Sequence, residues 1–491
     1  MTTQDNTPSQ ESTSRPLPGP AGVRPIWDGQ KETTPPGANI PGSELLGPSK
    51  LRWSSERAFA TKVNTKRIVG LDAARGLALF GMIAIHILPA YSPFTGRPTI
   101  IWDLFAGNAA ALFALLAGIS VALMTGANNP HKGRRLRRSR VSLAIRALII
   151  LLLGLALDEM RLRVYNILPY YGLMFLLAIV FTGMRIRSLL IWGGAFVILG
   201  PLAVYLVNSN MEYTVPTNPD FTSLFTMPQD TLITLVVGGI YPVVTWMAYI
   251  CVGLALGRMN LRWLLTQARL ILFGLLLLAA STFISTFLID QLGGFENLYL
   301  YTDGYDEEDI IDTLDYGPDG HLPTDTLWWL AISAPHTNTP FSLLRSLGAA
   351  LLLLGVMLIV SRAMSNVITP LIAAGSMALT MYVTHLMLFV AFGDQIRANP
   401  VWWFVGQIIV LFLLATFWKA AFGRGPLERV ISDVCKWSSR KLVPTNVDDQ
   451  QVDVESAADS QPTATIETES APPSEEGRSD NVDKDKEGEV Q

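Results

Sequence analysis

The chain has 491 residues, of which 50% are hydrophobic and only 16% are charged. So large an apolar share excludes an ordinary soluble protein. The formal net charge of −4 comes largely from residues 446–491, where fourteen Asp and Glu stand against three Lys and Arg, so no nucleic-acid-binding surface is expected. The two cysteines, Cys251 and Cys435, are too few for a disulfide framework or a cysteine metal site.

Both ends of the chain are predicted to be disordered tails. Residues 1–60 hold nine of the thirty prolines among Ser, Thr, Gly and Gln, a composition that buries too little apolar surface to offset the entropy of ordering. No apolar segment typical of a signal peptide falls within the first thirty residues. Residues 444–491 are predicted to form a second, acidic tail. A single transmembrane domain is predicted between the tails, over residues 67–430.

The predicted fold class of this domain is all-α, a polytopic transmembrane helix bundle of about ten spans. A helix needs roughly 20 apolar residues to cross a bilayer. Stretches near that length occur at residues 69–91, 100–124, 141–158, 165–183, 188–207, 232–256, 264–289, 342–361, 367–391 and 400–421.

The loops of the bundle alternate in their content of Lys and Arg, which predicts its orientation. Residues 127–140 hold six of these residues, whereas 208–230 and 291–340 hold none. By the positive-inside rule, both termini are expected in the cytoplasm and the bundle in the plasma membrane. The loops expected outside are 92–99, 159–164, 208–230, 290–340 and 392–399.

The first span carries a polar stripe. Asp72, Arg75, Leu79, Met82 and His86 follow one another at intervals of three or four residues, so they share one helical face. Asp72 and Arg75 are predicted either to bind a donor substrate at the cytoplasmic mouth or to form a structural ion pair. His86 lies roughly 21 Å further along the helix. It is predicted to be catalytic because imidazole exchanges protons near neutral pH, as the transfer of an acyl group from a donor to an acceptor hydroxyl or amine requires. A hydrogen bond to a neighbouring helix is the alternative role.

The second span adds an acid at the level where the first span ends. Asp103 begins this span on the outer side, and Asn108 follows within it. A carboxylate that accepts a hydrogen bond from one imidazole nitrogen raises the basicity of the other, so Asp103 is predicted to orient His86 in catalysis. An exposed acid at a helix start is the alternative. Asn108 is a candidate to line the acceptor cavity.

Further polar residues on the outer side are predicted to bind an acceptor. His336 precedes the eighth span, Arg345 lies in its first turns, and Tyr382 and His385 lie in the ninth span. His336 and Arg345 suit an acidic or phosphorylated acceptor, and the other two suit the lining of a cavity. His321, in the acidic outer loop, is expected to be solvated. The histidines lack the close spacing of zinc ligands, so no metal site is predicted.

Two loops have both a functional and a plain interpretation. The basic stretch 131–140, with Arg135 and Arg138, is a candidate site for coenzyme A or anionic lipid head groups. The alternative is that its Lys and Arg only set the topology of the chain, since cytoplasmic loops are generally rich in these residues. The outer loop 291–340 carries ten acidic residues and two neighbouring tryptophans. It is expected to be either a functional segment or a solvated acidic lid with an interfacial tryptophan anchor.

Several of these segments resemble known membrane families. The first span, residues 67–86, with Leu-Asp-Ala-Ala-Arg-Gly near its start, resembles the first helix of bacterial proteins related to the catalytic domain of heparan-alpha-glucosaminide N-acetyltransferase. Residues 375–382 and 423–428 resemble the end of the YeiB-like family of uncharacterised membrane proteins, and residues 335–348 are similar to that family too. The likeness covers about residues 67–430.

This resemblance implies a transmembrane acyltransferase that takes an acyl group from a cytosolic acyl-coenzyme A, and acetyl is the acyl group expected. The acceptor implied is a glycan or glycolipid at the outer side of the membrane. Acetyl-coenzyme A is expected as a donor substrate, and no cofactor is expected to stay bound. In the lysosomal enzyme the catalytic His follows the first helix, whereas residues 87–99 here contain none. His86 is the expected replacement, as a base or as an acyl carrier.

Two other functions stay open at this point. A transporter or lipid flippase would use the same polar stripe as a solute path, and the Gly-Gly-Ile-Tyr-Pro interruption at 238–242 is a feature of such proteins. A membrane scaffold would recruit partners through its tails. Membrane lipids are expected neighbours in every case, nucleic acid is not, and assembly with further copies of the chain is left open.

Overall fold

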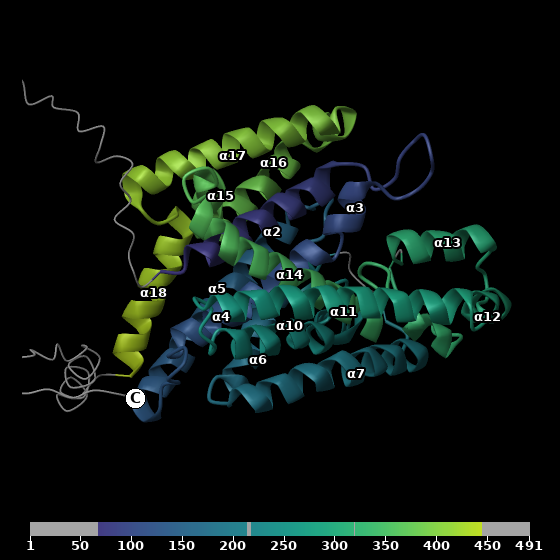
Figure 1. Cartoon of the computed structure of the whole chain (residues 1–491), viewed down its shortest axis with the longest axis horizontal. Helices are drawn as coiled ribbons and strands as arrows, with labels where there is room; N and C mark the ends of the chain where they lie inside the picture. The colour runs from purple at the N-terminus through teal and green to yellow at the C-terminus, as the bar shows by residue number, and fades with distance from the viewer. Residues whose placement is uncertain (1–66, 214–217, 319, 444–491) are drawn as a thin grey trace, which may run out of the picture. The chain divides into compact units, whose positions relative to one another are not determined.

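The computed structural model describes residues 67–213, 218–318 and 320–443, and the chain there is almost wholly helical (Figure 1). Within these ranges, extended segments pair only in an isolated bridge between Tyr91 and Pro98. The all-α fold class is therefore confirmed. The predicted disordered tails, residues 1–60 and 444–491, lie outside the described residues.

The helices fall into a long and a short class. The long ones are α2 (Val69–Ile87), α4 (Asn108–Met124), α5 (Gly133–Asp158), α6 (Leu168–Phe181), α7 (Ile186–Asn210), α10 (Val243–Leu256), α11 (Leu264–Asp290), α14 (Pro340–Ala363), α16 (Ala378–Ala398), α17 (Pro400–Phe422) and α18 (Pro426–Leu442). The short ones are α3 (Ile100–Phe105), α8 (Phe221–Thr226), α9 (Pro228–Ile233), η1 (Thr234–Gly238), α12 (Gly294–Tyr301), α13 (Glu307–Tyr316), η2 (Leu327–Ala331) and α15 (Thr369–Ser376).

The chain is a multi-pass membrane protein. Among the described residues, eight helices are long and apolar enough to cross a membrane, or nine if the pair Pro228–Gly238 and Val243–Leu256, bent by 47°, forms one span. The expected span 165–183 contains α6, whose 14 residues make a helix about 21 Å long, shorter than the helices counted as able to cross a membrane. It begins late because the Asn166 amide donates to the Asp158 carboxylate at 3.1 Å and holds the preceding residues in a loop.

Glycines allow the central helices to pack closely. A Cβ added at Gly375 of α15 would lie 1.8 Å from the carbonyl oxygen of Asp72, and one at Gly76 of α2 would lie 2.1 Å from that of Leu371. Gly118 of α4 makes a similar approach to α10. Such contacts between small residues are typical of helix association in membranes, where van der Waals packing replaces the hydrophobic effect. They place α2, α4, α10 and α15 at the centre of the bundle.

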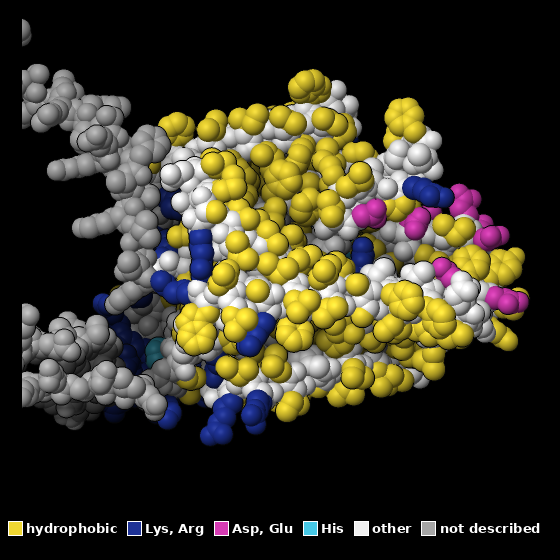
Figure 2. Space-filling view, in the orientation of Figure 1, with side chains coloured by type: hydrophobic (Ala, Val, Ile, Leu, Met, Phe, Trp, Pro, Cys, Tyr) yellow, Lys and Arg dark blue, Asp and Glu magenta, His cyan; other side chains and the backbone are white. Residues whose placement is uncertain are grey.

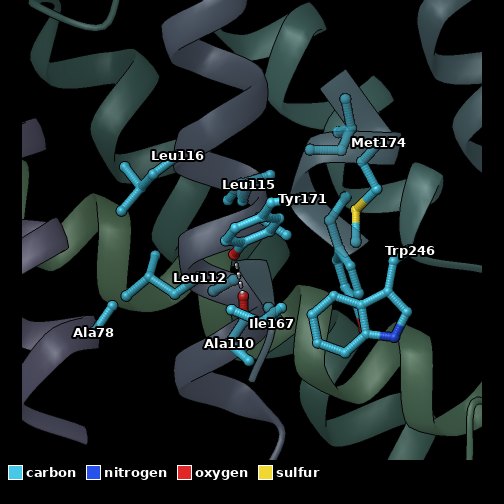
Figure 3. Packing of buried hydrophobic residues seen from close by; sticks show 14 of the residues in the cluster. Ala78, Ala110, Leu112, Leu115, Leu116, Ile167, Tyr171, Met174 and Trp246 are labelled. Carbon is cyan, nitrogen blue, oxygen red and sulfur yellow. Dashed lines mark hydrogen bonds between the residues drawn. The ribbon is translucent and has the colours of Figure 1, made fainter. Parts of the chain in front are cut away.

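The core beside these helices contains the hydrogen-bonded hydroxyl of Tyr171. Figure 3 shows Tyr171 of α6 among buried apolar residues, with its hydroxyl directed at the carbonyl of Ala110 in α4. The hydroxyl donates to that oxygen at 3.3 Å, and the Tyr171 side chain is 7% exposed. The bond ties α6 to α4, and Tyr171 also forms part of the cavity described below.

All five loops expected outside lie at one end of the bundle. The Tyr316 hydroxyl donates to the carbonyl of Gly96 at 2.8 Å, the Thr222 hydroxyl donates to Glu159 at 3.1 Å, and Arg163 pairs with Asp394 at 2.7 Å. In Figure 2 the Asp and Glu side chains gather there, near α12 and α13, and this is called the acidic end. Most Lys and Arg of that view lie at the opposite, basic end, where α18 runs across the ends of other helices (Figure 1).

The acidic outer loop is folded. Helices α12 and α13 and the turn η2 enclose a small second core around Trp329, which has no exposed surface and donates from its indole nitrogen to the Thr302 hydroxyl at 3.1 Å. The expectation of an interfacial tryptophan anchor is therefore wrong for Trp329. The sequence pattern did not show that Ile310 and Leu298, from two short helices, belong to the same core as Trp329.

Candidate functional site

A cavity of about 330 Å³ lies among α2, α4, α5, α6, α15, α16 and α18. Most of its lining is apolar. The charged and polar residues that line it are Arg75, Ser120, Arg146, Tyr171, Ser376, Tyr382 and Glu428. A pocket of mainly apolar walls with a few polar groups is typical of a small-molecule site.

An ion-pair network forms one wall of the cavity near the start of α2. The carboxylate of Asp72, which is 3% exposed, accepts from Arg75 at 2.9 Å and from Arg67 at 2.7 Å. Arg75 also donates to the Ser120 hydroxyl at 2.6 Å. The structural ion pair expected as the alternative for Asp72 and Arg75 is present. Arg75 nevertheless lines the cavity, so its predicted contact with a donor remains open to test.

Arg146 and Glu428 face the same cavity from α5 and α18. The Arg146 Nε atom is buried and has no hydrogen-bond partner among the described residues, and the charged neighbours of Arg146 are Glu428 and Arg75. The Glu428 carboxylate accepts from the backbone nitrogen of Thr380 at 3.1 Å and from its hydroxyl at 2.5 Å, which caps the first turn of α16. Because Glu428 is occupied in this way, Arg146 is the group best placed to receive an anion.

The cavity reaches close to the histidines of the bundle. Met82 of α2 and Tyr382 of α16 line it. His86 follows Met82 by four residues and His385 follows Tyr382 by three, which places each imidazole about one helical turn, roughly 5–6 Å, further along its helix. Arg75 and the histidines are therefore at opposite ends of this path.

His86 and His385 form a hydrogen-bonded pair. His86 Nδ1 lies 3.0 Å from His385 Nε2, and the two rings are nearly parallel, at 12°. His385 is fully buried, whereas His86 is partly exposed. On its other side, His385 Nδ1 lies 2.8 Å from Oε1 of Gln407 in α17. His86 is therefore the outermost member of a chain that crosses three helices.

Asp103 does not occupy the place expected of it. Within the part of the chain that the structure describes, His86 Nδ1 bonds to His385, and no hydrogen bond joins His86 to Asp103. The side chain of Asp103 is exposed, and its electrostatic neighbours are Arg345 and Asp315. A break at Ala106 and Gly107, where Gly107 has a φ of 71°, separates α3 from α4. The alternative interpretation, an exposed acid at a helix start, describes its position.

Asn108 and Arg345 both bind backbone carbonyls of α3, beside its break with α4. The Asn108 amide nitrogen donates to the carbonyls of Asp103 at 3.4 Å and Leu104 at 3.1 Å, while its Oδ1 is buried without a partner. Arg345 donates to the carbonyls of Asp103 and Ser333, both at 3.4 Å. Asn108 and Arg345 thus both donate to the carbonyl of Asp103, and their role in binding an acceptor stays a prediction.

His336 lies in the loop before α14, in the left-handed conformation at φ 59°. Its ring packs edge-on against Tyr241 at 5.6 Å, Nδ1 is buried without a partner, and His86 is an electrostatic neighbour. Burial lowers the pKa of His336 to about 4. His336 is therefore neutral at neutral pH, so the charge that would bind an anionic acceptor belongs to Arg345.

The buried state of His336 predicts a pH-dependent stability. Since an unfolded His titrates near 6.5, the unfolded chain takes up a proton first as the pH falls. The stability contributed by neutral His336 is present above pH 6.5 and is lost as the pH falls toward 4. We expect the melting temperature of the wild type to fall more between pH 6.5 and 4.5 than that of His336→Asn, a neutral residue that tolerates this backbone. Equal slopes would contradict the assignment.

Arg135, Arg138 and His321, the remaining residues named from the sequence, do not line the cavity. Arg135 and Arg138 lie at the start of α5. His321 is half-buried and not fully solvated: its ring packs against Tyr213 at 5.0 Å, and burial lowers its pKa. Over residues 67–443, leaving aside the few positions not described, no group of His, Cys, Asp and Glu is arranged to hold a metal ion.

Arg146, Glu428 and Gln407 were not predicted from the sequence as site residues. Arg146 and Gln407 interrupt apolar runs at 141–158 and 400–421, and polar residues in such runs usually face the protein interior. That signal would have found both of them. Glu428 lies beyond the last span, in a segment noted only for its resemblance to a family motif. The return of α18 toward α16 brings it to the cavity.

Two family models match the chain. Residues 67–284 match "Heparan-alpha-glucosaminide N-acetyltransferase, catalytic", and residues 322–437 match "Protein of unknown function (DUF418)". A search of curated proteins finds no match. The cavity is lined from both matched segments, and the histidine pair takes His86 from the first and His385 from the second. The two segments therefore build one site.

Proposed function

The chain is related to the membrane family of the heparan-alpha-glucosaminide N-acetyltransferase catalytic domain and the DUF418 proteins, and on that premise we propose that it is a transmembrane acyltransferase. The proposed donor is a cytosolic acyl-coenzyme A, with acetyl as the first acyl group to test. The proposed acceptor is a glycan or glycolipid at the outer side of the plasma membrane.

One observation carries this proposal. The cavity begins at Arg75 and Arg146 and ends about one helical turn short of the His86–His385 pair. Such a path suits a donor that is anionic at one end and reactive at the other. By the positive-inside rule, the basic end faces the cytoplasm, where acyl-coenzyme A is made, and the acidic end faces outward.

The donor is proposed to bind along this path. Arginine binds phosphate oxygens well, and Arg146 has a buried Nε without a protein partner. A volume of about 330 Å³ suits the narrow thioester arm of the donor rather than the whole molecule. The nucleotide would then stay at the basic end, beside Arg135 and Arg138, while the apolar walls exclude water from the thioester.

The transfer step is proposed to use the free ring nitrogen of His86. Nδ1 is engaged by His385, so Nε2 is the atom that can take a proton. As a base, it takes the proton of an acceptor hydroxyl or amine, whose oxygen or nitrogen attacks the thioester carbonyl. The C–S bond breaks, and the thiolate receives the proton from the imidazolium. As an acyl carrier, Nε2 attacks the carbonyl itself, the C–S bond breaks, and coenzyme A leaves as a thiolate. The acceptor oxygen or nitrogen then takes the acyl group from Nε2, and the acceptor's proton goes to the thiolate. Arg345, His336 and Asn108 are proposed to hold the acceptor.

Donor binding is tested with purified protein in nanodiscs. A donor at 100 times its dissociation constant stabilises the folded state by about 2.7 kcal/mol, so acetyl-coenzyme A is expected to raise the melting temperature. Wild type should also release free coenzyme A when acceptor glycolipids are present. We expect Arg146→Gln to weaken donor binding about tenfold, since about 1.4 kcal/mol of charge-assisted bonding is lost.

The control is Arg187→Gln, which removes the same charge from an exposed residue that does not line the cavity. Its donor affinity should stay within about twofold of wild type. If acetyl-coenzyme A and longer acyl donors neither stabilise the protein nor are consumed, the proposed donor is wrong.

A transporter or lipid flippase is the second candidate function. The bend of 47° between Pro228–Gly238 and Val243–Leu256 favours it, because broken helices build the binding sites of many transporters. Here the break is filled by protein, since Asn338 accepts from the Trp246 indole at 2.8 Å and donates to the carbonyl of Ile240 at 3.4 Å. A solute gradient that is dissipated without consumption of a thioester would favour transport over acyl transfer.

A further inference from the structure

The hydrogen bonds of the histidine pair continue to a third residue. Gln407 lies in α17, is 4% exposed, and presents its Oε1 to His385 Nδ1 at 2.8 Å. His385 in turn presents Nε2 to His86 Nδ1 at 3.0 Å. Gln407, His385 and His86 therefore form a chain across α17, α16 and α2, and only His86 is partly exposed.

The direction of every proton in this chain follows from its buried end. An amide oxygen can only accept, so His385 Nδ1 must carry the hydrogen. A neutral imidazole carries one N–H, which leaves His385 Nε2 as an acceptor. His86 Nδ1 must then donate to it, and His86 Nε2 is left without a hydrogen. The orientation of the Gln407 amide thus sets the tautomer of His86 through the hydrogen bonds of His385.

The opposite orientation of the amide would reverse the chain. If Gln407 presented its NH₂ group to His385 Nδ1, His385 Nε2 would donate to His86 Nδ1, and His86 Nε2 would carry the proton. A protonated Nε2 can neither accept a proton nor attack a thioester. In the structure Oε1, and not the NH₂ group, faces His385 Nδ1, and among the described residues the NH₂ group has no hydrogen-bond partner. With Oε1 in that place, the imidazole N–H is the donor and the amide oxygen the acceptor.

We propose that Gln407 is a positioning residue that fixes, through His385, the tautomer in which His86 Nε2 is free. This inference rests on the proposed function for its chemical meaning. It also changes the role expected for His385, which orients His86 from behind instead of lining the acceptor site. An amide does not exchange protons near neutral pH, so the chain ends at Gln407 and does not conduct protons onward. A carboxylate, the expected orienting group, is replaced by a neutral amide in an apolar environment, where a buried charge is costly.

The test combines nitrogen NMR with two matched variants. The chain has five histidines, so ¹⁵N-histidine labelling in nanodiscs gives few ring signals, and His86→Asn and His385→Asn assign the pair. In wild type we expect His86 Nε2 and His385 Nε2 to show the shift of an unprotonated nitrogen. Gln407→Glu keeps an oxygen acceptor and should keep this tautomer. Gln407→Met keeps the size of the side chain without an acceptor and should give a mixture.

Turnover provides the second measurement. A wrong tautomer in comparable catalytic groups lowers turnover by up to about 10⁴-fold, so we expect Gln407→Met to lose about 100-fold in kcat. Its stabilisation by acetyl-coenzyme A should be unchanged, because Gln407 does not line the cavity. Gln407→Glu should recover most of that loss. If Gln407 had only a structural role, both Gln407→Met and Gln407→Glu would be less stable than wild type. The His86 tautomer would then stay as in wild type, and the two variants would have similar turnover rates.

The outcomes separate this inference from the proposed function. A wild-type His86 with a protonated Nε2, or a Gln407→Met protein with the wild-type tautomer, would overturn the inference. Since the wild-type spectrum suffices for the first of these, poor folding of a variant does not remove the test. Tautomers as expected, in a protein that consumes no thioester, would support the inference about Gln407 and reject acyl transfer.

Discussion

His86→Ala is expected to abolish acyl transfer and leave donor binding intact. The positioned imidazole is proposed to act as base or acyl carrier, and such groups typically contribute 10²- to 10⁴-fold to the rate. We therefore expect turnover to fall about 10³-fold. His86 lies beyond the lining residue Met82 and does not line the cavity, so acetyl-coenzyme A should still raise the melting temperature by the wild-type amount. Coenzyme A release and thermal unfolding of the same preparation measure both effects.

His321→Ala is the matched control. His321 packs on Tyr213 and belongs to neither the cavity nor the His86–His385 pair. Its turnover should stay near that of wild type. If His86→Ala retained full turnover, the proposed transfer step would be wrong, whereas loss of turnover together with loss of donor stabilisation would indicate a folding defect.

The second large effect is expected at the crossing of α2 and α15. The Cβ of Gly375→Ala would lie 1.8 Å from the carbonyl oxygen of Asp72 and 2.5 Å from the backbone nitrogen of Gly76. Backbone atoms cannot move aside as a flexible side chain can, so the two helices must separate. Overpacking of this kind costs about 3 kcal/mol or more. We expect a marked fall in melting temperature and weaker donor binding, since Gly375 also lines the cavity.

Gly406→Ala is the control for this substitution. Gly406 lies inside α17, and a Cβ there meets no atom within 4 Å. Alanine is favoured over glycine within a helix by about 1 kcal/mol, so stability should be unchanged or slightly higher. Equal melting temperatures for Gly375→Ala and Gly406→Ala would show that α2 and α15 do not pack as closely as described.

The sequence alone determined the class of fold and the ends of the bundle. Apolar runs near 20 residues specify membrane helices because a bilayer admits only backbone that satisfies its own hydrogen bonds. The distribution of Lys and Arg grouped the loops correctly, as the contacts Tyr316–Gly96 and Arg163–Asp394 confirm for that end of the bundle. The helical period also placed Asp72, Arg75 and His86 along one helix, α2.

The partners of these residues were decided only by the tertiary structure. Periodicity orders residues along one helix but does not say which face meets which neighbour. Asp103, near His86 in sequence, is exposed and has no hydrogen bond to His86 among the described residues, while His385 and Gln407, about 300 residues further on, come to it across the bundle. Arg146 and Glu428 likewise reach the cavity from α5 and α18. Close glycine crossings and the return of α18 set these distances, and both depend on contacts between distant segments, which one sequence does not reveal.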